Sequence, residues 1–278
     1  MKVIRDPREE WPLLDGTLGF VPTMGALHEG HLHLMRTAGL ECDHVAASIF
    51  VNPTQFGAGE DFERYPRDED ADFAMAESAG VSWMFAPTAE AMYAHRTTSI
   101  RVADVSERWE GASRPGHFDG VATVVAKLFH IVRPNVAFFG EKDFQQCAVI
   151  RRMVEDLDFR LSLRFVETVR EPDGLALSSR NRYLSESDRR TAPSLYAALQ
   201  SASQALAKMD SWNEVRAEQV ISDARASLAD KGFSVEYLAV VRADDLAPFD
   251  GVGDARVIAA ARLGVTRLID NTGVPMHA

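Results

Sequence analysis

The sequence predicts an α/β protein in which an open parallel sheet with helices on both faces is followed by a smaller α+β domain. Two observations support this prediction. Over the first 168 residues, short apolar runs alternate with helical patterns, which is the order of βαβ units. From residue 169 onwards, two helical stretches come first and three strand-like runs follow them. We therefore expect one domain at residues 1–168 and a smaller one at residues 169–278.

The elements of the first domain follow from their boundary residues. The first strand ends at Pro22, which cannot donate a hydrogen bond to a neighbouring strand. Asp119 is expected to cap a helix that stops before Pro134, and Asp143 is expected to open the next helix. The expected strands are 18–22, 45–51, 81–86, 136–139 and 161–169, and the expected helices are 31–40, 120–132 and 143–157.

The second domain begins with a largely helical stretch over residues 185–208. Ser211 and Glu214 have the spacing of a capping box, which predicts a second helix that ends before Gly232. The expected strands that follow are 235–242, 256–262 and 266–269.

Composition restricts the class of protein. Hydrophobic residues make up 46% of the 278 residues, enough for a core without disulfides, so Cys42 and Cys147 are interpreted as packing residues. The 41 acidic and 30 basic residues give a net charge of −11, which argues against a nucleic-acid or membrane-surface partner. We recognise neither a signal peptide nor the run of ~20 apolar residues that a membrane helix needs, and therefore expect a cytoplasmic protein.

The segment PTMGALHEGH, residues 22–31, is the first candidate site. It follows the first strand, and ligands of open parallel sheets bind beyond the carboxyl ends of the strands. Gly25 and Gly30 let the backbone approach a ligand, and the free N–H groups of the next helix attract anions. His28 and His31 share one face of a helical turn. A tight turn with two surface histidines is the alternative. Neither a P-loop nor the glycine fingerprint of dinucleotide-binding proteins occurs.

Two further segments place amides and a lysine at the same edge of the sheet. Gln55 follows the second strand and is interpreted as a substrate-binding amide, whereas Asn52 is equally well explained as the cap of a turn. Lys142 stands just before a helix start, which favours contact with phosphate or base. Asp143 and Gln146 could instead cap that helix reciprocally.

Three more segments are weaker on their own. The two hydroxyls of Ser178 and Ser179 with the guanidinium of Arg180 could grip phosphate, or could form an ordinary polar loop. Arg114 and His117 flank a Pro-Gly pair in a segment that could cover the site as a flap. The acidic run 68–72 could hold Mg²⁺ through water, but the first turn of a solvated helix explains it more simply.

Taken together, these segments resemble the pantoate–β-alanine ligases, also called pantothenate synthetases. The matching stretches span residues 22 to 271. They are PTMGALHEGH, SIFVNPTQF, RYPR, GASRPGHFDGV, FFGEKDFQQ, DGLALSSRNRYLS and TRLIDN. The two-histidine segment occurs throughout the wider nucleotidylyltransferase superfamily, but the set in this order is specific. One departure is the short segment 7–15 before the first strand, where the family carries a longer helix.

The resemblance implies a Rossmann-like first domain, a smaller second domain that covers the site, and a homodimer. It implies that the protein condenses pantoate with β-alanine, uses ATP and Mg²⁺, passes through pantoyl adenylate and releases AMP and pyrophosphate. His31 falls on the position of the proton donor, and His28 is its partner on the phosphates. Lys142 and Arg180 fall on ATP contacts, and we assign them to catalysis together with the histidines.

The remaining positions transfer by motif. Gln55 and Gln146 fall on the amides that bind pantoate, and Gln55 also lies near β-alanine. Tyr65 and Asp72 fall near the pyrophosphate and the metal, and Arg114 and His117 are assigned to the substrates. The positions that fall on ATP contacts are Met24, Gly25, Ala26, Leu27, His28, Glu29, Gly30, His31, Gly140, Glu141, Lys142, Asp143, Val169, Leu177, Ser178, Ser179 and Arg180.

The implied chemistry explains these residue types. A carboxylate must attack the α-phosphate of ATP although both are anions, so positive groups are needed, and we expect Lys142, Arg180, His28 and His31 to supply them with Mg²⁺. No activated nucleophile is evident, in keeping with a reaction that forms no covalent enzyme intermediate. Two alternatives stay open: a nucleotidylyltransferase whose product keeps the nucleotide, and an adenine-nucleotide-binding module without catalysis.

Overall fold

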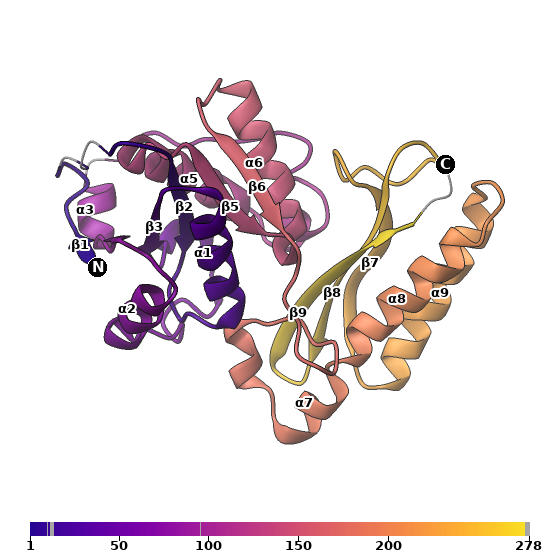
Figure 1. Ribbon diagram of the computed structural model, residues 1–278. Coiled ribbons are helices and arrows are strands. Elements are labelled where there is room, and N and C mark those ends of the chain that lie inside the picture. Colours follow the sequence, from indigo (N-terminus) through magenta and orange to yellow (C-terminus); the bar gives the residue numbers. More distant parts are fainter. Residues whose placement is uncertain (10, 12–13, 95, 276–278) are drawn as a thin grey trace.

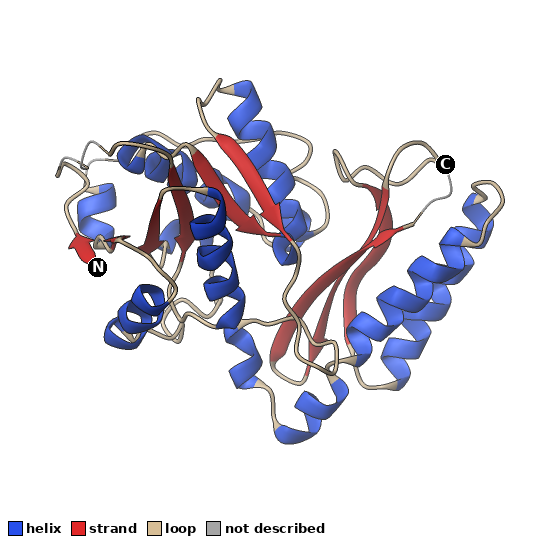
Figure 2. Ribbon diagram, viewed as in Figure 1, coloured by secondary structure: helices blue, strands red, loops and turns tan. Residues whose placement is uncertain are grey.

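The computed structural model describes residues 1–9, 11, 14–94 and 96–275, and it contains two sheets (Figures 1 and 2). Six parallel strands form the first sheet in the order β1-β4-β3-β2-β5-β6. Three antiparallel strands form the second sheet in the order β7-β8-β9. This is the predicted fold class. The strands are β1 Lys2–Ile4, β2 Leu18–Thr23, β3 His44–Ile49, β4 Trp83–Phe85, β5 Val136–Gly140, β6 Ser162–Val166, β7 Ser234–Arg242, β8 Ala255–Leu263 and β9 Thr266–Val274.

The helices lie on both faces of the first sheet and on one face of the second, where α8 and α9 cover the outer side (Figure 1). The α-helices are α1 Glu29–Glu41, α2 Glu69–Ser78, α3 Ala89–Tyr93, α4 Glu110–Ser113, α5 His117–Val132, α6 Phe144–Asp156, α7 Glu186–Thr191, α8 Ser194–Ala207 and α9 Glu214–Asp230. Short 3₁₀ turns occupy Pro53–Gln55, Glu141–Asp143 and Ser179–Tyr183. Within the described part of the chain, no helix combines the length and apolarity that crossing a membrane requires.

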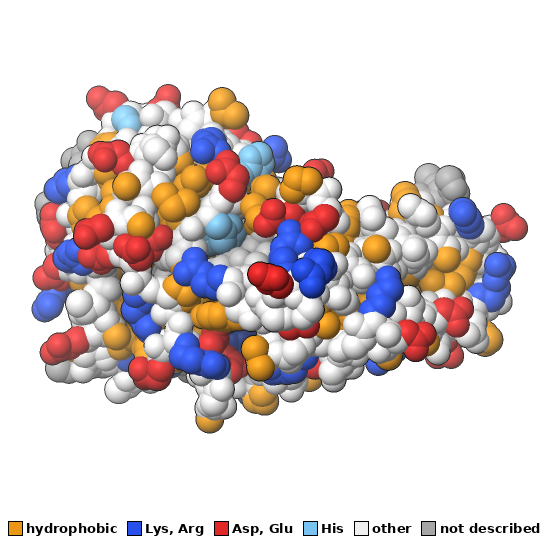
Figure 3. All heavy atoms as spheres, turned by 90° about the horizontal axis from the view of Figure 1, so that it is seen from below, with side chains coloured by type: hydrophobic (Ala, Val, Ile, Leu, Met, Phe, Trp, Pro, Cys, Tyr) orange, Lys and Arg blue, Asp and Glu red, His pale blue; other side chains and the backbone are white. Residues whose placement is uncertain are grey.

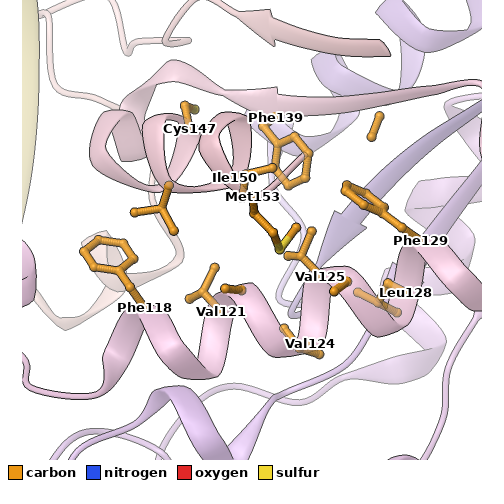
Figure 4. Close-up of a cluster of buried hydrophobic side chains, with 14 of the residues drawn as sticks. Phe118, Val121, Val124, Val125, Leu128, Phe129, Phe139, Cys147, Ile150 and Met153 are labelled. Atoms are coloured by element: carbon orange, nitrogen blue, oxygen red, sulfur yellow. The ribbon is translucent and has the colours of Figure 1, made fainter. Parts of the chain in front are cut away.

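Apolar side chains on both faces of the parallel sheet hold these layers together. One cluster packs Phe20, Phe85 and Phe139 of the sheet against α5 and α6, and Figure 4 shows its side chains between the two helices. The opposite cluster packs α1 and α2 against the other face, through residues such as Met35 and Met84. Cys42 and Cys147 are buried free thiols in these clusters, as predicted. A third cluster joins α8 and α9 to the second sheet.

Several boundaries differ from the predictions, and each has a local cause. Helix α5 begins three residues early, because Gly116 at φ 81° supplies the turn that Asp119 was expected to cap. The helical stretch 185–208 is two helices, since Pro193 lacks the N–H that would continue the hydrogen bonding. Asn213, not Ser211, caps α9 by accepting a hydrogen bond from the N–H of Arg216. Strand β1, which was not predicted, pairs with β4 at the edge of the sheet.

Two other predictions concern the ends of the first domain. The described residues of the segment 7–15 form no helix, and residues 10, 12 and 13 of that segment lie outside the described part. The proposed boundary at residue 169 falls after β6, the last strand of the parallel sheet, and before the 3₁₀ turn at Ser179–Tyr183. It stays a prediction.

Candidate active site

A cavity of about 220 Å³ opens where the carboxyl ends of β2 and β5 meet. The chain leaves β2 for β3 on one side of the sheet, whereas β5 lies on the other side of β2, so this is the switch point at which open α/β sheets bind ligands. Most of the predicted site residues line the cavity: Met24, His28, Gly30, His31, Gln55, Arg114, His117, Gly140, Lys142, Asp143, Gln146, Val169, Leu177, Ser178, Ser179 and Arg180.

A second cavity of about 700 Å³ shares several lining residues with the first and extends to β8 and β9 of the second sheet. Arg114, Lys142 and Gln146 line both cavities. Figure 3 shows the molecule from below the view of Figure 1. A histidine side chain, in pale blue, lies there in a hollow, with basic and acidic side chains gathered beside it. Five predicted ATP contacts do not line the smaller cavity, namely Gly25, Ala26, Leu27, Glu29 and Glu141.

His28 and His31 cap the first turn of α1 reciprocally. The Nδ1 atom of His28 accepts a hydrogen bond from Gly30 N at 3.2 Å, and Nδ1 of His31 accepts from His28 N at 3.4 Å. Their ring centroids lie 4.1 Å apart. Because both Nδ1 atoms are acceptors, a neutral ring must carry its proton on Nε2. The two rings therefore present N–H donors to the cavity.

In the protein alone, the surroundings of both rings disfavour the charged form. Burial, followed by the nearby charge of Lys142, lowers the pKa of His28 to about 4. Burial and then its two neighbours, His28 and Lys142, lower the pKa of His31 to about 3. Both imidazoles are therefore neutral at pH 7, and what they offer a phosphate is a fixed hydrogen bond rather than a charge.

Asp72 fixes the loop that leads into α1. Its carboxylate is 4% exposed, and its two oxygens accept hydrogen bonds from Ala26 N at 2.8 Å and Leu27 N at 2.7 Å. Gly25 has φ 80°, and a Cβ there would lie 2.8 Å from Asp72 Oδ2. The acidic run does form the start of a helix, α2, with Asp68 as its cap. Asp72 faces the loop and lines neither cavity.

Gln55 is held in place by Asn52. The amide nitrogen of Asn52 donates to Gln55 Oε1 at 3.0 Å, while Asn52 Oδ1 accepts from Thr54 N and from the Tyr93 hydroxyl. Asn52 is 1% exposed and caps the 3₁₀ turn, which decides between its two interpretations. Gln55 Nε2 donates to the Met24 sulfur at 2.9 Å, at the wall of the cavity.

Helix α6 has no side-chain cap, so the reciprocal cap by Asp143 and Gln146 is not formed, and Gln146 faces both cavities. The neighbouring Gln145 is the buried structural amide, since it accepts from Glu110 N and donates to the carbonyls of Val105 and Arg108. Lys142 lies 3.7 Å from Asp143 and is 20% exposed.

Arg180 is paired with a carboxylate that sequence reasoning missed. Its guanidinium donates two hydrogen bonds of 2.9 Å to Asp61, which belongs to the loop after Gln55. Burial alone would raise the pKa of Asp61, but the Arg180 pair outweighs it and holds the pKa below its usual value. The Ser179 hydroxyl lies 3.4 Å from the Tyr65 hydroxyl, and Ser178 accepts from Arg180 N. Asp61 and Arg180 are 119 residues apart in the sequence, so no local pattern indicates that they pair.

Arg114 and His117 form a packed corner rather than a loose flap. Arg114 donates to both oxygens of Glu60 at 2.7 and 2.6 Å and reaches the Gln55 carbonyl at 3.3 Å. His117 Nδ1 donates to the same carbonyl at 2.8 Å, so its bare Nε2 accepts from Arg114 at 3.1 Å. Burial lowers the pKa of His117 to about 4, in keeping with this neutral role.

Comparison with known proteins decides the family. Residues 1–273 match the model of the pantoate–β-alanine ligases. The chain belongs to the pantoate–β-alanine ligase family. A pantothenate synthetase of Rhizorhabdus wittichii is 54% identical over 260 residues, which cover 92% of this chain and 90% of that protein. One of Acinetobacter baylyi is 49% identical over 265 residues, covering 94% of this chain and 92% of that protein.

Solved structures of the same family have this fold. Pantothenate synthetase from Thermus thermophilus matches with a TM-score of 0.90 at 45% identity, covering 99% of both chains. Pantoate–β-alanine ligase from Francisella tularensis, solved with β,γ-ATP and β-alanine, matches with a TM-score of 0.82 at 32% identity, covering 100% of this chain and 99% of that one. The protein is thus a ligase that joins pantoate to β-alanine in pantothenate biosynthesis, which favours this function over the two alternatives above.

Proposed function

We propose that the smaller cavity holds the reacting ends of ATP and pantoate, and that β-alanine reaches them from the larger cavity. His28, His31, Lys142 and Arg180 bind the phosphates, with the hydroxyls of Ser178 and Ser179 beside them. The main chain at 24–31 and 140–143, with Val169 and Leu177, binds the rest of the nucleotide. The observation that best supports this assignment is the pair of self-capped imidazoles at the switch point, on the same cavity as Lys142 and Gln55.

Pantoate occupies the side of the cavity that Gln55 and Gln146 line. These two amides provide donors and acceptors for its hydroxyl and carboxylate groups. Behind them α5 supplies an apolar wall, to which Val121, Val124 and Val125 contribute. That wall suits the branched hydrocarbon of pantoate, and it was missed in the sequence because a valine that lines a cavity follows the same helical spacing as one in a core.

The reaction proceeds in two displacements. A carboxylate oxygen of pantoate attacks the α-phosphorus of ATP, and the bond to the β-phosphate oxygen breaks, giving pantoyl adenylate and pyrophosphate. The neutral amine of β-alanine then attacks the acyl carbon, AMP leaves with the bonding electron pair, and the amine proton passes to solvent. Lys142 offsets the charge of the phosphates, while the Nε2–H groups of His28 and His31 are oriented before ATP arrives.

Mg²⁺ enters this site with ATP. The ion is bound mainly by phosphates and water in enzymes of this chemistry, and it needs few protein ligands. The described residues contain no group of three or more His, Cys, Asp or Glu side chains that fits a metal ion. Asp72 would reach such an ion through water, because it lines neither cavity and its two oxygens orient the 26–27 backbone.

The test separates the two displacements. Exchange of labelled pyrophosphate into ATP should require pantoate, and release of AMP should then require β-alanine. A product that keeps the nucleotide would favour a nucleotidylyltransferase, and ATP binding without exchange would favour a module without catalysis. We also propose a cytoplasmic homodimer, as the family resemblance implies; sedimentation of the purified protein at the mass of one 30.7 kDa chain would contradict the dimer.

A further inference from the structure

Ion pairs along the larger cavity form a continuous chain from the second sheet to the turn at Gln55. Glu236 on β7 accepts from Arg262 at 3.0 Å and from Arg267 at 2.9 Å. Arg267 on β9 donates to both oxygens of Glu110 at 2.7 and 2.8 Å. Arg114 follows at 3.4 Å from Glu110, and it holds Glu60 with two short bonds. Positive and negative side chains alternate along this row of ion pairs, from Arg262 to Glu60.

Glu110 is the central member of this chain, and its position is strongly constrained. It is 5% exposed and begins the short helix α4, directly after Trp109, whose φ of 47° is uncommon for a bulky residue. The Tyr237 hydroxyl donates to Glu110 Oε2 at 3.1 Å, and Gln145 accepts from the Glu110 backbone N–H at 3.0 Å. A carboxylate this deeply buried requires a cationic partner.

Arg114 lies between Glu60 and Glu110, and its hydrogen bonds to Glu60 are the shorter ones. It makes bonds of 2.7 and 2.6 Å to Glu60, and from this position it also reaches the Gln55 carbonyl. Its contact with Glu110 is longer, at 3.4 Å, whereas Arg267 donates to both Glu110 oxygens at 2.7 and 2.8 Å. Without Arg267, Glu110 would be a buried charge whose nearest cation is Arg114. Arg114 would then move towards Glu110 and away from Glu60 and Gln55.

We propose that Arg267 and Glu110 are positioning residues for the pantoate side of the active site. By holding Glu110, strand β9 keeps Arg114 on Glu60 and on the Gln55 carbonyl. This contact supports the turn at Gln55 together with His117, which donates to the same carbonyl, and Asn52, which holds the side-chain amide. The second domain thereby contributes to pantoate binding through an ion pair and not only by covering the site. This inference rests on the proposed position of pantoate at Gln55.

Arg267→Gln tests it in the pantoate-dependent exchange of pyrophosphate into ATP. The KM for pantoate should rise about tenfold while the KM for ATP changes less than about twofold, because the Gln55 side loses the Arg114 contact and the histidine side loses none. The double variant Glu110→Gln with Arg267→Gln removes the unpaired charge as well. It should recover the KM for pantoate to within about threefold of the unchanged protein, since coupled residues are not additive.

Arg262→Gln is the matched control. Arg262 pairs with the same Glu236, but it is 53% exposed and is not bonded to Glu110. Its KM values should stay within about twofold of those of the unchanged protein. An equal change in the control and in Arg267→Gln would overturn the inference. An unchanged KM for pantoate in Arg267→Gln would also overturn it, and so would equal changes in the KM values for pantoate and ATP. A double variant with a higher KM for pantoate than Arg267→Gln would overturn it as well.

Two further outcomes are also decisive. If circular dichroism shows that Arg267→Gln is unfolded, Arg267→Lys, which keeps the charge but loses the two-pronged geometry, should still raise the KM for pantoate by about threefold. An unchanged value there overturns the inference. If the unchanged protein shows no pantoate-dependent exchange, the proposed position of pantoate fails and the inference fails with it. Failure of the variants alone leaves that position intact.

Discussion

The histidine corner, His28 and His31, and the arginine side of the cavity, Arg114 and Arg180, prepare for ligands in opposite ways. The histidines are neutral, and each is oriented by a backbone N–H from the same turn. The arginines are charged, and each makes two hydrogen bonds to a carboxylate from a loop elsewhere in the chain, Glu60 or Asp61. The histidines are oriented by backbone groups alone, whereas the guanidinium of Arg180 would be shared between Asp61 and a phosphate.

This difference separates two tasks of the site. Groups that are oriented before substrate arrives stabilise developing charge without a reorganisation cost, which is the requirement of the adenylation step. When a cationic group already has a carboxylate partner, an anionic ligand must compete with that carboxylate, and this competition lowers the affinity for the ligand. We therefore expect substitutions in the histidine corner to lower the rate of chemistry, and substitutions on the arginine side to change substrate affinity.

The largest effect is expected for His31→Ala. Removal of a preoriented donor should lower the rate of pantoyl adenylate formation by ~10²-fold or more in a single-turnover assay. His33→Ala is the matched control, because His33 lies on the same helix, is exposed and does not line the cavity. A near-normal single-turnover rate for His31→Ala would refute the role of this ring.

Asp72→Asn should have an intermediate effect. An amide in place of the carboxylate can accept only one of the two N–H groups of Ala26 and Leu27, so the loop before the histidines loosens. We expect kcat/KM to fall about tenfold, as when a catalytic group is slightly misplaced, with no recovery at higher Mg²⁺ concentration. Recovery by added Mg²⁺ would show instead that Asp72 binds the metal.

The predictability of the site follows the same division. The turn at residues 22–31 was recognised because its strand, glycines and histidines are contiguous in the sequence, and the structure places His28 and His31 at the switch point of the sheet. Their neutral state was not predicted, because burial is a property of the folded chain. Asp61 and Glu110 were missed because their partners, Arg180 and Arg267, lie more than a hundred residues away.

The fold shows a comparable limit. The five strands predicted for the first domain are present because each is an apolar run with clear boundaries. Strand β1 is a three-residue edge strand that pairs with β4, and it carries no distinctive pattern. Helix ends were wrong where two capping residues competed. A glycine with positive φ replaced Asp119 in this role, and Asn213 replaced Ser211. Local propensity decides that a helix forms, and its exact start depends on packing.

A smaller effect, in the opposite direction, is expected for Asp61→Asn on the arginine side. The carboxylate competes with phosphates for Arg180, so its neutralisation should lower the KM for ATP by about threefold without changing kcat. Glu63→Gln is the control, since Glu63 is an exposed acid of the same loop. An unchanged or higher KM for ATP in Asp61→Asn, with the control unaffected, would mean that Asp61 does not compete.

The smallest expected effect concerns the pH profile, and it tests the neutral state of the histidine corner. In the pantoate-dependent exchange, kcat/KM reports groups of the free enzyme. The pKa values of His28 and His31 lie at about 4 and about 3, so both rings stay neutral as the pH falls from 8 towards 5.5. A histidine with an ordinary pKa of about 6.5 would be about nine-tenths protonated at the end of that range.

We therefore expect kcat/KM for exchange to change less than about twofold over this range on account of these rings. Below about pH 5 activity should fall, because protonation puts a hydrogen on Nδ1, which then opposes the N–H groups of Gly30 and His28 instead of accepting from them. An inflection near pH 6.5 that disappears in His28→Gln would mean that the ring titrates with an ordinary pKa and becomes a cation as the pH falls below neutral. The histidine corner would then act by charge, as the arginine side does, and the contrast between them would be lost.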